Sequence, residues 1–379
     1  MSQDMMYGFP RVIRGNSLMG ELRWDGATNP LAVAESMTSP LDMCYGFGGS
    51  DVRMAYPEFS TIPAVTVSDG YSAVVLHTNG RIYHIPDSAT SVAEYDPVAD
   101  TVSYFGSLSA TSGKWRSGIL APNGKIYCAP FVSINWLEID VVARTATVLS
   151  NTLSAFYGPT ILANNGIAFG IPNDSSSGNV TFLNTLTKAI GTFGSTGTVG
   201  YESAVLGPDG RIYCIPWASG TTNIGIIDPI NMTFTLGPSV TPGSSNSHWR
   251  GAVMAPNGKI YFIPSSATNV IEYEPLSGTV KTIGTVSAST LKWRGGFLGP
   301  DGCIYGIPHS QSTMLKINPY MGTVEEFGSL SGSSKWSGAV MTQNGVAYTG
   351  TARSDTILKI DFKCQINRDC TLSKEYNKF

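Results

Sequence analysis

The sequence contains few charged residues. Aspartate, glutamate, lysine and arginine make up 13% of the 379 residues, about half of the usual share. The net charge is −3 and the basic residues form no run, so neither nucleic acid nor a membrane is expected as a partner. No apolar run approaches the roughly 18 residues of a transmembrane helix, and the first twenty residues lack the apolar stretch of a signal peptide. We therefore expect a soluble protein made in the cytoplasm.

Cysteine and histidine are also scarce. The sequence has six cysteines, and its four histidines are His77, His84, His248 and His309. Cys128 and Cys214 occupy the same position of an internal repeat, which predicts small core residues. Cys364 and Cys370 are near neighbours, but no histidine cluster accompanies them. Neither a zinc site nor a disulfide is supported. No metal or other cofactor is predicted.

Glycine and proline, by contrast, are abundant. The 42 glycines and 22 prolines accompany many serines, threonines and asparagines, a profile typical of short strands joined by many turns. Hydrophobic residues make up 42% of the chain, which is enough to bury a core and argues against disorder.

An internal repeat organises most of the chain. Its clearest copy runs from Trp249 to Pro264 and reads WRGAVMAPNGKIYFIP, and six variants begin at other aromatic residues. The turn glycines of the seven copies lie 42 to 48 residues apart, at Gly80, Gly124, Gly166, Gly210, Gly258, Gly302 and Gly345. A fixed period of this length indicates a repeat architecture.

Each copy resolves into four short strands. In the fifth copy the predicted strands are residues 251–255, 259–263, 270–273 and 279–283, and Asn257 and Gly258 form the tight turn between the first two. Four antiparallel strands repeated seven times, with no helical period, predict an all-β fold, a seven-bladed β-propeller.

The last copy lacks its fourth strand. After residues 357–360 the chain continues without the turn and Thr-Val strand of the other copies. Residues 61–67, just before the first copy, form a β-branched run whose Pro63 suits an edge strand. We expect this N-terminal segment to complete the seventh blade and close the ring. The domains are then an irregular arm at 1–59, a propeller at 60–363 and a tail at 364–379.

The repeat resembles a known group of propellers. Residues 208–213 (PDGRIY) and 226–229 (IIDP), followed by a threonine-rich strand, resemble the repeats of kelch-like, NHL-like and streptogramin-lyase-like propellers. The resemblance covers residues 71–361 and implies the fold. The matching residues are turn formers and core positions, so it says little about function. The lyases use histidine, glutamate and magnesium, and no consistent His/acid pair stands beside the four histidines here.

One recurring polar position follows the third strand. It is occupied by Asp96, Asp140, Asp228, Glu274, Asn318 and Asp361. Such a series could suggest calcium sites, but four members are followed by proline, which favours a turn capped by the acidic or amide side chain.

The long loops between second and third strands, and between blades, are expected on one face of the disc. They are rich in Ser, Thr, Asn and Gly, and Trp217, His248 and His309 are candidate binding residues on this face. Hydroxyls and amides can bind a sugar or a polar protein surface but supply no obvious acid, base or nucleophile. No catalytic residue is assigned, although the two histidines are the best enzymatic candidates.

Charged residues follow the aromatic residue at the head of several innermost strands. Arg116, Arg250 and Arg294 occur there in three copies, and Glu202 in a fourth. One interpretation is a cationic mouth of the central channel that binds a carboxylate, a phosphate or an acidic side chain. The other is structural, with each arginine stacked on an aromatic ring and paired with an acid of the next blade.

Three functions follow from these patterns. The first is a non-enzymatic interaction protein, because low charge, polar loops and an irregular arm resemble the structural or tail-associated proteins of bacteriophages and other large viruses. Located in a virion, it would bind other structural proteins through the arm and present its loop face to a protein or receptor. The second is a carbohydrate-binding propeller, and the third a streptogramin-lyase-like enzyme.

Overall fold

The computed structural model describes residues 56–63, 70–153, 156–173, 178–197, 199–217, 222–240, 248–352, 354 and 356–363. It also describes two short strands that pair with each other, β1 (Val12–Ile13) and β2 (Leu22–Arg23). Most of the predicted arm and the tail at 364–379 lie outside the described residues, as do Cys364 and Cys370.

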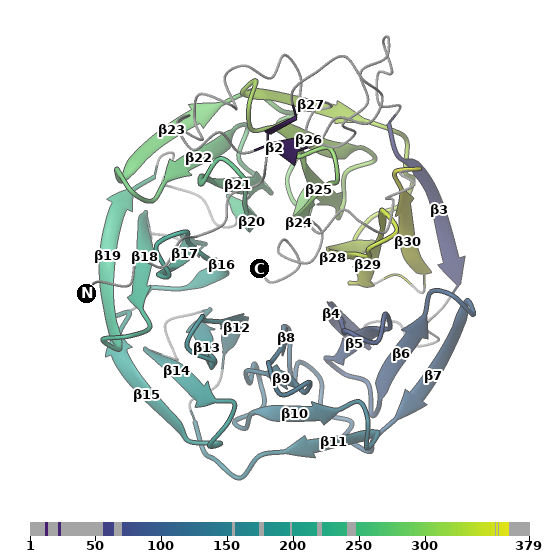
Figure 1. Ribbon diagram of the computed structural model, residues 1–379, viewed down its shortest axis with the longest axis vertical. Helices are drawn as coiled ribbons and strands as arrows, with labels where there is room; N and C mark the ends of the chain where they lie inside the picture. The colour runs from purple at the N-terminus through teal and green to yellow at the C-terminus, as the bar shows by residue number, and fades with distance from the viewer. Residues whose placement is uncertain are drawn as a thin grey trace.

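Seven four-stranded antiparallel sheets stand around a common axis, which confirms the predicted seven-bladed β-propeller (Figure 1). Blade 1 contains β4 (Tyr71–Leu76), β5 (Ile82–Pro86), β6 (Val92–Asp96) and β7 (Thr101–Phe105). Blade 2 contains β8 (Ile119–Leu120), β9 (Ile126–Cys128), β10 (Leu137–Asp140) and β11 (Thr145–Val148). Blade 3 contains β12 (Tyr157–Leu162), β13 (Ile167–Pro172), β14 (Asn179–Asn184) and β15 (Ile190–Ser195). Blade 4 contains β16 (Tyr201–Leu206), β17 (Ile212–Pro216), β18 (Asn223–Asp228) and β19 (Thr233–Ser239).

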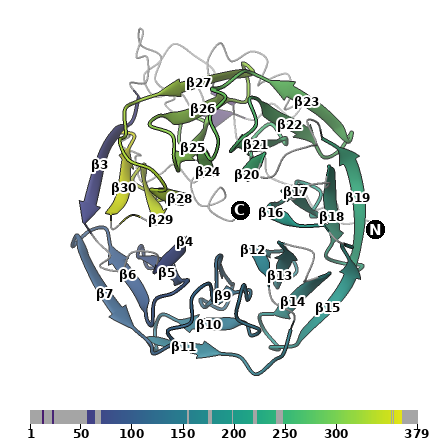
Figure 2. The ribbon, with the colours of Figure 1, turned by 180° about the vertical axis from the view of Figure 1, so that it is seen from behind.

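The remaining blades repeat this order from the axis outward (Figure 2). Blade 5 contains β20 (Trp249–Met254), β21 (Ile260–Pro264), β22 (Val270–Glu274) and β23 (Thr279–Ile283). Blade 6 contains β24 (Trp293–Leu298), β25 (Ile304–Pro308), β26 (Met314–Asn318) and β27 (Thr323–Phe327). Blade 7 contains β28 (Trp336–Met341), β29 (Val346–Thr351), β30 (Thr356–Asp361) and, as its outermost strand, β3 (Glu58–Pro63).

The N-terminal strand closes the ring as predicted. β3 pairs antiparallel with β30 from Glu58 opposite Asp361 to Pro63 opposite Thr356. The strand begins three residues earlier than the expected start at Thr61, and residues 64–67 lie outside the described part of the chain. Pro63 stands in an edge strand, where a residue without an N–H group is tolerated.

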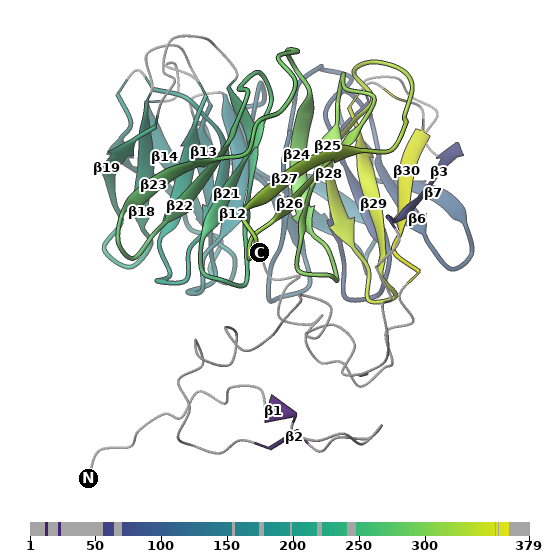
Figure 3. The same ribbon diagram turned by 90° about the horizontal axis from the view of Figure 1, so that it is seen from above.

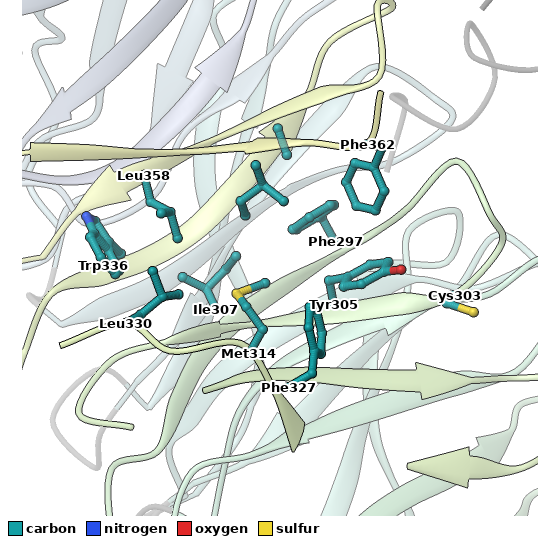
Figure 4. Close-up of a cluster of buried hydrophobic side chains, with 12 residues drawn as sticks. Phe297, Cys303, Tyr305, Ile307, Met314, Phe327, Leu330, Trp336, Leu358 and Phe362 are labelled. Carbon is teal, nitrogen blue, oxygen red and sulfur yellow. The ribbon is translucent and has the colours of Figure 1, made fainter. Parts of the chain in front are cut away.

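The hydrophobic core lies between neighbouring blades. The second strand of most blades is buried throughout, because it has a strand on either side and a blade on either face. One buried cluster joins Phe297, Tyr305 and Met314 of blade 6 to Trp336 and Leu358 of blade 7 (Figure 4). The outermost strands, such as β23, are largely exposed. Cys128 and Cys214 are buried core residues, as predicted.

Turns of two kinds form one face of the disc, here called the hairpin face. The first joins strands one and two, as at Asn257, where Gly258 adopts a φ of +78°. The second joins strands three and four. There the Asp96 carboxylate accepts hydrogen bonds from the backbone N–H groups of Val98 and Ala99, at 2.9 and 3.1 Å. Asp140, Asp228 and Asn318 cap their turns in the same way, which confirms the turn interpretation of these positions.

The opposite face, here called the loop face, carries the loops between strands two and three and between blades. In the side view of Figure 3 the two faces are the two ends of the strands. Backbone hydrogen bonds join neighbouring blades at this face. The N–H of Lys114 donates to Asp87, and that of Lys335 donates to His309. The innermost strands begin here, so side chains at their heads lie near the axis.

Innermost strands of blades 5 to 7 approach each other at three glycines. A Cβ atom on Gly251 would lie 2.8 Å from the Gly295 Cα, and one on Gly295 would lie 2.7 Å from the Gly338 Cα. The other four blades have Ala, Ser or Pro at this position, so small residues occur throughout. Such contacts between backbones leave no room for a side chain.

We expect Gly295→Ala to destabilise the propeller far more than Gly338→Ala. Both glycines have positive φ, +73° and +60°, so both changes carry a left-handed backbone cost of about 1–2 kcal/mol. Only the Gly295 change adds a clash, because a Cβ on Gly338 has nothing within 4 Å. The clash should add about 1–3 kcal/mol. Thermal unfolding of the two variants checks this, and equal losses would contradict it.

Candidate functional site

The predicted charged residues meet at the head of the innermost strands, on the loop face. Glu202, Arg250 and Arg294 are the second residues of β16, β20 and β24, which surround the axis in Figures 1 and 2. Arg116 precedes β8 and follows Trp115, which bridges to Pro130. The repeat therefore places four charged side chains at equivalent positions around one axis.

Arg294 and Glu202 form an ion pair between blades 6 and 4. The guanidinium Nη2 lies 3.3 Å from a Glu202 carboxylate oxygen, so the pair joins two blades that are not adjacent in the ring. Asn173, in the loop after β13, donates to the other Glu202 oxygen at 2.9 Å and to the Tyr201 carbonyl at 3.1 Å. Glu202 is thus held from two sides. Sequence reasoning missed Asn173, although it follows the recurrent proline that ends the second strand in five of the seven blades.

Arg116 is held by an acid and an aromatic ring. Its Nε lies 3.7 Å from the Asp87 carboxylate, and its guanidinium carbon lies 3.5 Å from the centre of the Phe131 ring. Burial raises the pKa of Asp87, and the Arg116 charge opposes this rise. Asp87 follows Pro86 at the end of β5, the position that Asn173 has in blade 3. These contacts agree with the structural interpretation of Arg116.

Arg250 stands at the head of blade 5, between the blades that carry Glu202 and Arg294. Its guanidinium carbon is 5.8 Å from the centre of the Trp217 ring, in the loop after β17. Burial lowers the pKa of Arg250, Glu202 opposes that shift, and the charges of Arg294 and Arg116 add to it. The three arginines therefore act on each other electrostatically. We call Asp87, Arg116, Glu202, Arg250 and Arg294 the axial cluster, and three cations against two carboxylates leave one excess positive charge.

The two candidate histidines have different surroundings. His248 stands directly before β20, and its ring centre lies 5.3 Å from that of Trp249. His309 follows β25 and is buried, with its Nδ1 3.4 Å from the Trp336 carbonyl oxygen. Burial lowers the pKa of His248, which favours the neutral imidazole. Within the described ranges, no group of three or more His, Cys, Asp or Glu residues could hold a metal ion.

Three buried lysines hold the loops of this face, and sequence reasoning missed them. Lys114, Lys292 and Lys335 each precede the tryptophan that heads an innermost strand. The Lys335 ammonium donates to the carbonyls of Gln311, Leu330 and Gly332 at 2.7 to 3.2 Å. Burial lowers the pKa of Lys292 to about 8. The recurrent Lys-Trp pair was a signal for this structural role, because an ammonium can donate to three loop carbonyls at once.

His84 is a titratable group of the core rather than of the loop face. It is fully buried in β5, and neither ring nitrogen has a hydrogen-bond partner in the structure. Its ring makes an edge contact with Tyr71 at 5.9 Å between centres. Burial lowers the pKa of His84 to about 4. In blade 5 the equivalent position is occupied by Phe262, so the site is built for an uncharged side chain.

This shift predicts a loss of stability in mild acid. Below its ordinary pKa of about 6.5, His84 binds a proton in the unfolded chain but not in the folded one. The free energy of unfolding should therefore fall by about 2 kcal/mol from this residue between pH 7 and pH 5. His84→Phe should remove that part of the pH dependence. Denaturant unfolding at pH 7 and at pH 5 measures the free energy of unfolding of both proteins. An equal fall between the two pH values in both proteins would contradict the prediction.

Comparison with known proteins agrees with the fold. A family model described as "Repeat of unknown function (DUF6923)" matches residues 204–371. No curated protein matches the sequence. A streptogramin B lyase structure is 13% identical, with a TM-score of 0.68, and the match covers 82% of this chain and 99% of the lyase. Virginiamycin B lyase from Staphylococcus aureus is 12% identical, with a TM-score of 0.68 and coverage of 80% and 99%.

Hydrazine synthase from Kuenenia stuttgartiensis has the same fold at 14% identity, with a TM-score of 0.62 and coverage of 80% and 98%. At these identities the likeness shows a shared seven-bladed architecture alone. A propeller fold neither establishes nor excludes catalysis. No helix in the described ranges is long and apolar enough to span a membrane.

Proposed function

We propose that the protein is a non-enzymatic interaction module whose loop face binds an acidic group of a partner protein or receptor at the axial cluster. The convergence of Arg116, Arg250 and Arg294 from three blades carries this proposal. Guanidinium groups bind carboxylates through paired, charge-assisted hydrogen bonds. Partial burial strengthens such bonds, because water screens them less.

The acids already present in the cluster define how a ligand would bind. A Glu202 carboxylate oxygen lies 3.3 Å from the Arg294 Nη2, and an Asp87 carboxylate oxygen lies 3.7 Å from the Arg116 Nε. An incoming carboxylate would use the net positive charge of the axial cluster and compete with Glu202 for Arg294. A neutral ligand would gain nothing from this competition, so the arrangement favours acidic partners.

We expect Arg250→Ala and Arg294→Ala each to weaken binding of an acidic probe, a short polyglutamate peptide, at least about tenfold. Glu202→Gln should tighten it, because Arg294 would lose its competing carboxylate. The matched control is Arg211→Ala, which removes an exposed arginine from the hairpin face. Isothermal titration at low salt measures the four affinities, with polyglutamine as the neutral probe.

Unchanged affinity in the Arg250 and Arg294 variants, together with a lower melting temperature, would assign the arginines a purely structural role. Binding of glycans rather than of acidic peptides would favour the carbohydrate-binding alternative. Trp217, partly buried beside Arg250, offers an aromatic surface for a sugar ring. In that outcome Trp217→Ala and His309→Ala should abolish binding on a glycan array.

The proposed setting is a virion, in which the arm before the propeller docks to another structural protein. Low charge and Ser/Thr/Gly-rich loops support this part. The described residues also mark where the arm ends and the propeller begins, because the Tyr56 ring stacks on that of Phe327 with 4.4 Å between ring centres and β3 begins at Glu58.

Removing residues 1–55 should therefore abolish co-purification of an assembly partner while leaving the propeller folded. A deletion reaching residue 59 would also cut into β3, so it would not be a clean test. Native pull-down and mass spectrometry of the full chain and of the shortened chain measure the effect. A partner retained equally by both would contradict docking through the arm.

A further inference from the structure

The turns between third and fourth strands share a feature that the loop-face function does not use. In blades 1 to 6 each turn presents a large apolar side chain to solvent. These residues, here called the apolar tips, are Val98, Val142, Leu186, Ile230, Leu276 and Met321. Their exposed fractions run from 97% at Val98 to 69% at Met321.

The tips occupy equivalent positions of the repeat. Five lie two residues after the acid or amide that caps the turn, and Met321 lies three residues after Asn318. The turn places the preceding residue inward, so Val141 is buried while Val142 is 89% exposed. Single exposed apolar residues are common on protein surfaces. The same exposed position is filled by Val, Leu or Ile in five blades, and in blade 6 the exposed Met321 follows one residue later. The fold does not account for this pattern, because these side chains pack against nothing in the core.

Three of the tips, Leu186, Ile230 and Met321, stand on turns that an asparagine of the neighbouring blade holds. The Asn123 side chain donates to the Thr185 carbonyl, directly before Leu186, at 2.9 Å. The Asn165 side chain donates to the Pro229 carbonyl, directly before Ile230, at 3.0 Å. Asn257 does the same for Pro319 at 3.2 Å. These three tips are therefore held in place by the neighbouring blade rather than carried on free loops.

Together the tips form an open ring at the perimeter of the hairpin face. The outermost strands that follow them, from β7 to β27, run along the perimeter in Figures 1 and 2. Blade 7 has no such turn, because β3 enters and β30 leaves at that place, with Glu58 opposite Asp361. The gap in the ring is thus where the chain passes into and out of the propeller.

We infer that the ring of apolar tips is a self-association surface, through which a second copy of this chain stacks hairpin face against hairpin face. In a twofold contact residue i of one copy meets residue j of the other, and j meets i, so a ring of similar apolar side chains is complementary to itself. Six such side chains offer on the order of 400–700 Å² of apolar surface. With the flanking turns this approaches the roughly 800 Å² per partner of a standard interface.

Charge favours a second copy over a lipid surface. The turns that carry the tips hold five acids, Asp96, Asp100, Asp140, Asp228 and Glu274, against two cations, Arg144 and Lys188, and this net negative charge disfavours an anionic bilayer. A twofold axis through blade 2 places blade 1 of one copy opposite blade 3 of the other. In that arrangement the acidic turn of blade 1, with Asp96 and Asp100, would face the turn of blade 3 that carries Lys188, whose ammonium already pairs with Glu138 within one copy.

Sedimentation equilibrium of the full chain from about 1 to 100 μM tests this inference. Two variants with all six tips substituted form a matched pair, one with serine at every tip and one with leucine at every tip. The unchanged protein and the leucine variant should be dimers, and the serine variant should associate at least about tenfold more weakly. Melting temperatures should agree among the three at a concentration low enough for all of them to be monomers, because the tips make no core contacts and only association would stabilise one protein over another.

A monomer at every concentration of the unchanged protein would overturn the inference, as would a serine variant that dimerises equally well. Co-sedimentation with phosphatidylcholine vesicles by a monomeric protein would overturn it in favour of a lipid surface. Acidic-peptide binding at the loop face is measured separately, so failure of one proposal does not mimic failure of the other.

Discussion

The backbone pairing of β3 with β30 is the interaction on which the ring depends. Six residue pairs, from Glu58 and Asp361 to Pro63 and Thr356, join the first described strand of the propeller to the last. Each blade buries both faces against neighbours, so an incomplete blade 7 would expose the core beside Trp336 and Leu358. Closure of this kind protects the sheet edges and fixes the distance between all innermost strands.

Ring closure fixes the distance between the innermost strands, and with it both faces of the disc. The loop face and the hairpin face can therefore serve different purposes. At the loop face, loops from several blades meet, and buried lysines such as Lys335 bind their carbonyls. That face collects charged side chains around the axis. At the hairpin face the turns are short and nearly identical, so one substitution pattern is repeated around the perimeter. The first face suits one ligand at its centre, and the second suits a large surface of matching shape.

Local patterns predicted the fold well because turn chemistry is local. Gly258 and the asparagine before it define a hairpin from two adjacent residues, and Pro63 indicates an edge strand by its missing donor. The candidate site was predicted only in part. Equivalent repeat positions brought Arg250, Arg294 and Glu202 together, but the partners Asp87 and Asn173 come from loops whose approach depends on how blades pack. Likewise, the adjacent residues Val141 and Val142 have the same chemistry, and only the turn geometry decides which one is exposed.

Both ends of the propeller's chain lie in the outer half of blade 7, at the hairpin face, since Glu58 stands opposite Asp361. A tag or a fluorescent domain fused at either end of the propeller would therefore emerge on the same side of the disc. On a sensor chip, a molecule tethered by either end would turn its loop face towards the solution. The last repeat supplies only three strands and leaves the fourth to β3, so both ends of the propeller lie at the hairpin face. This strand arrangement, and not any binding residue, decides which face points to the solution.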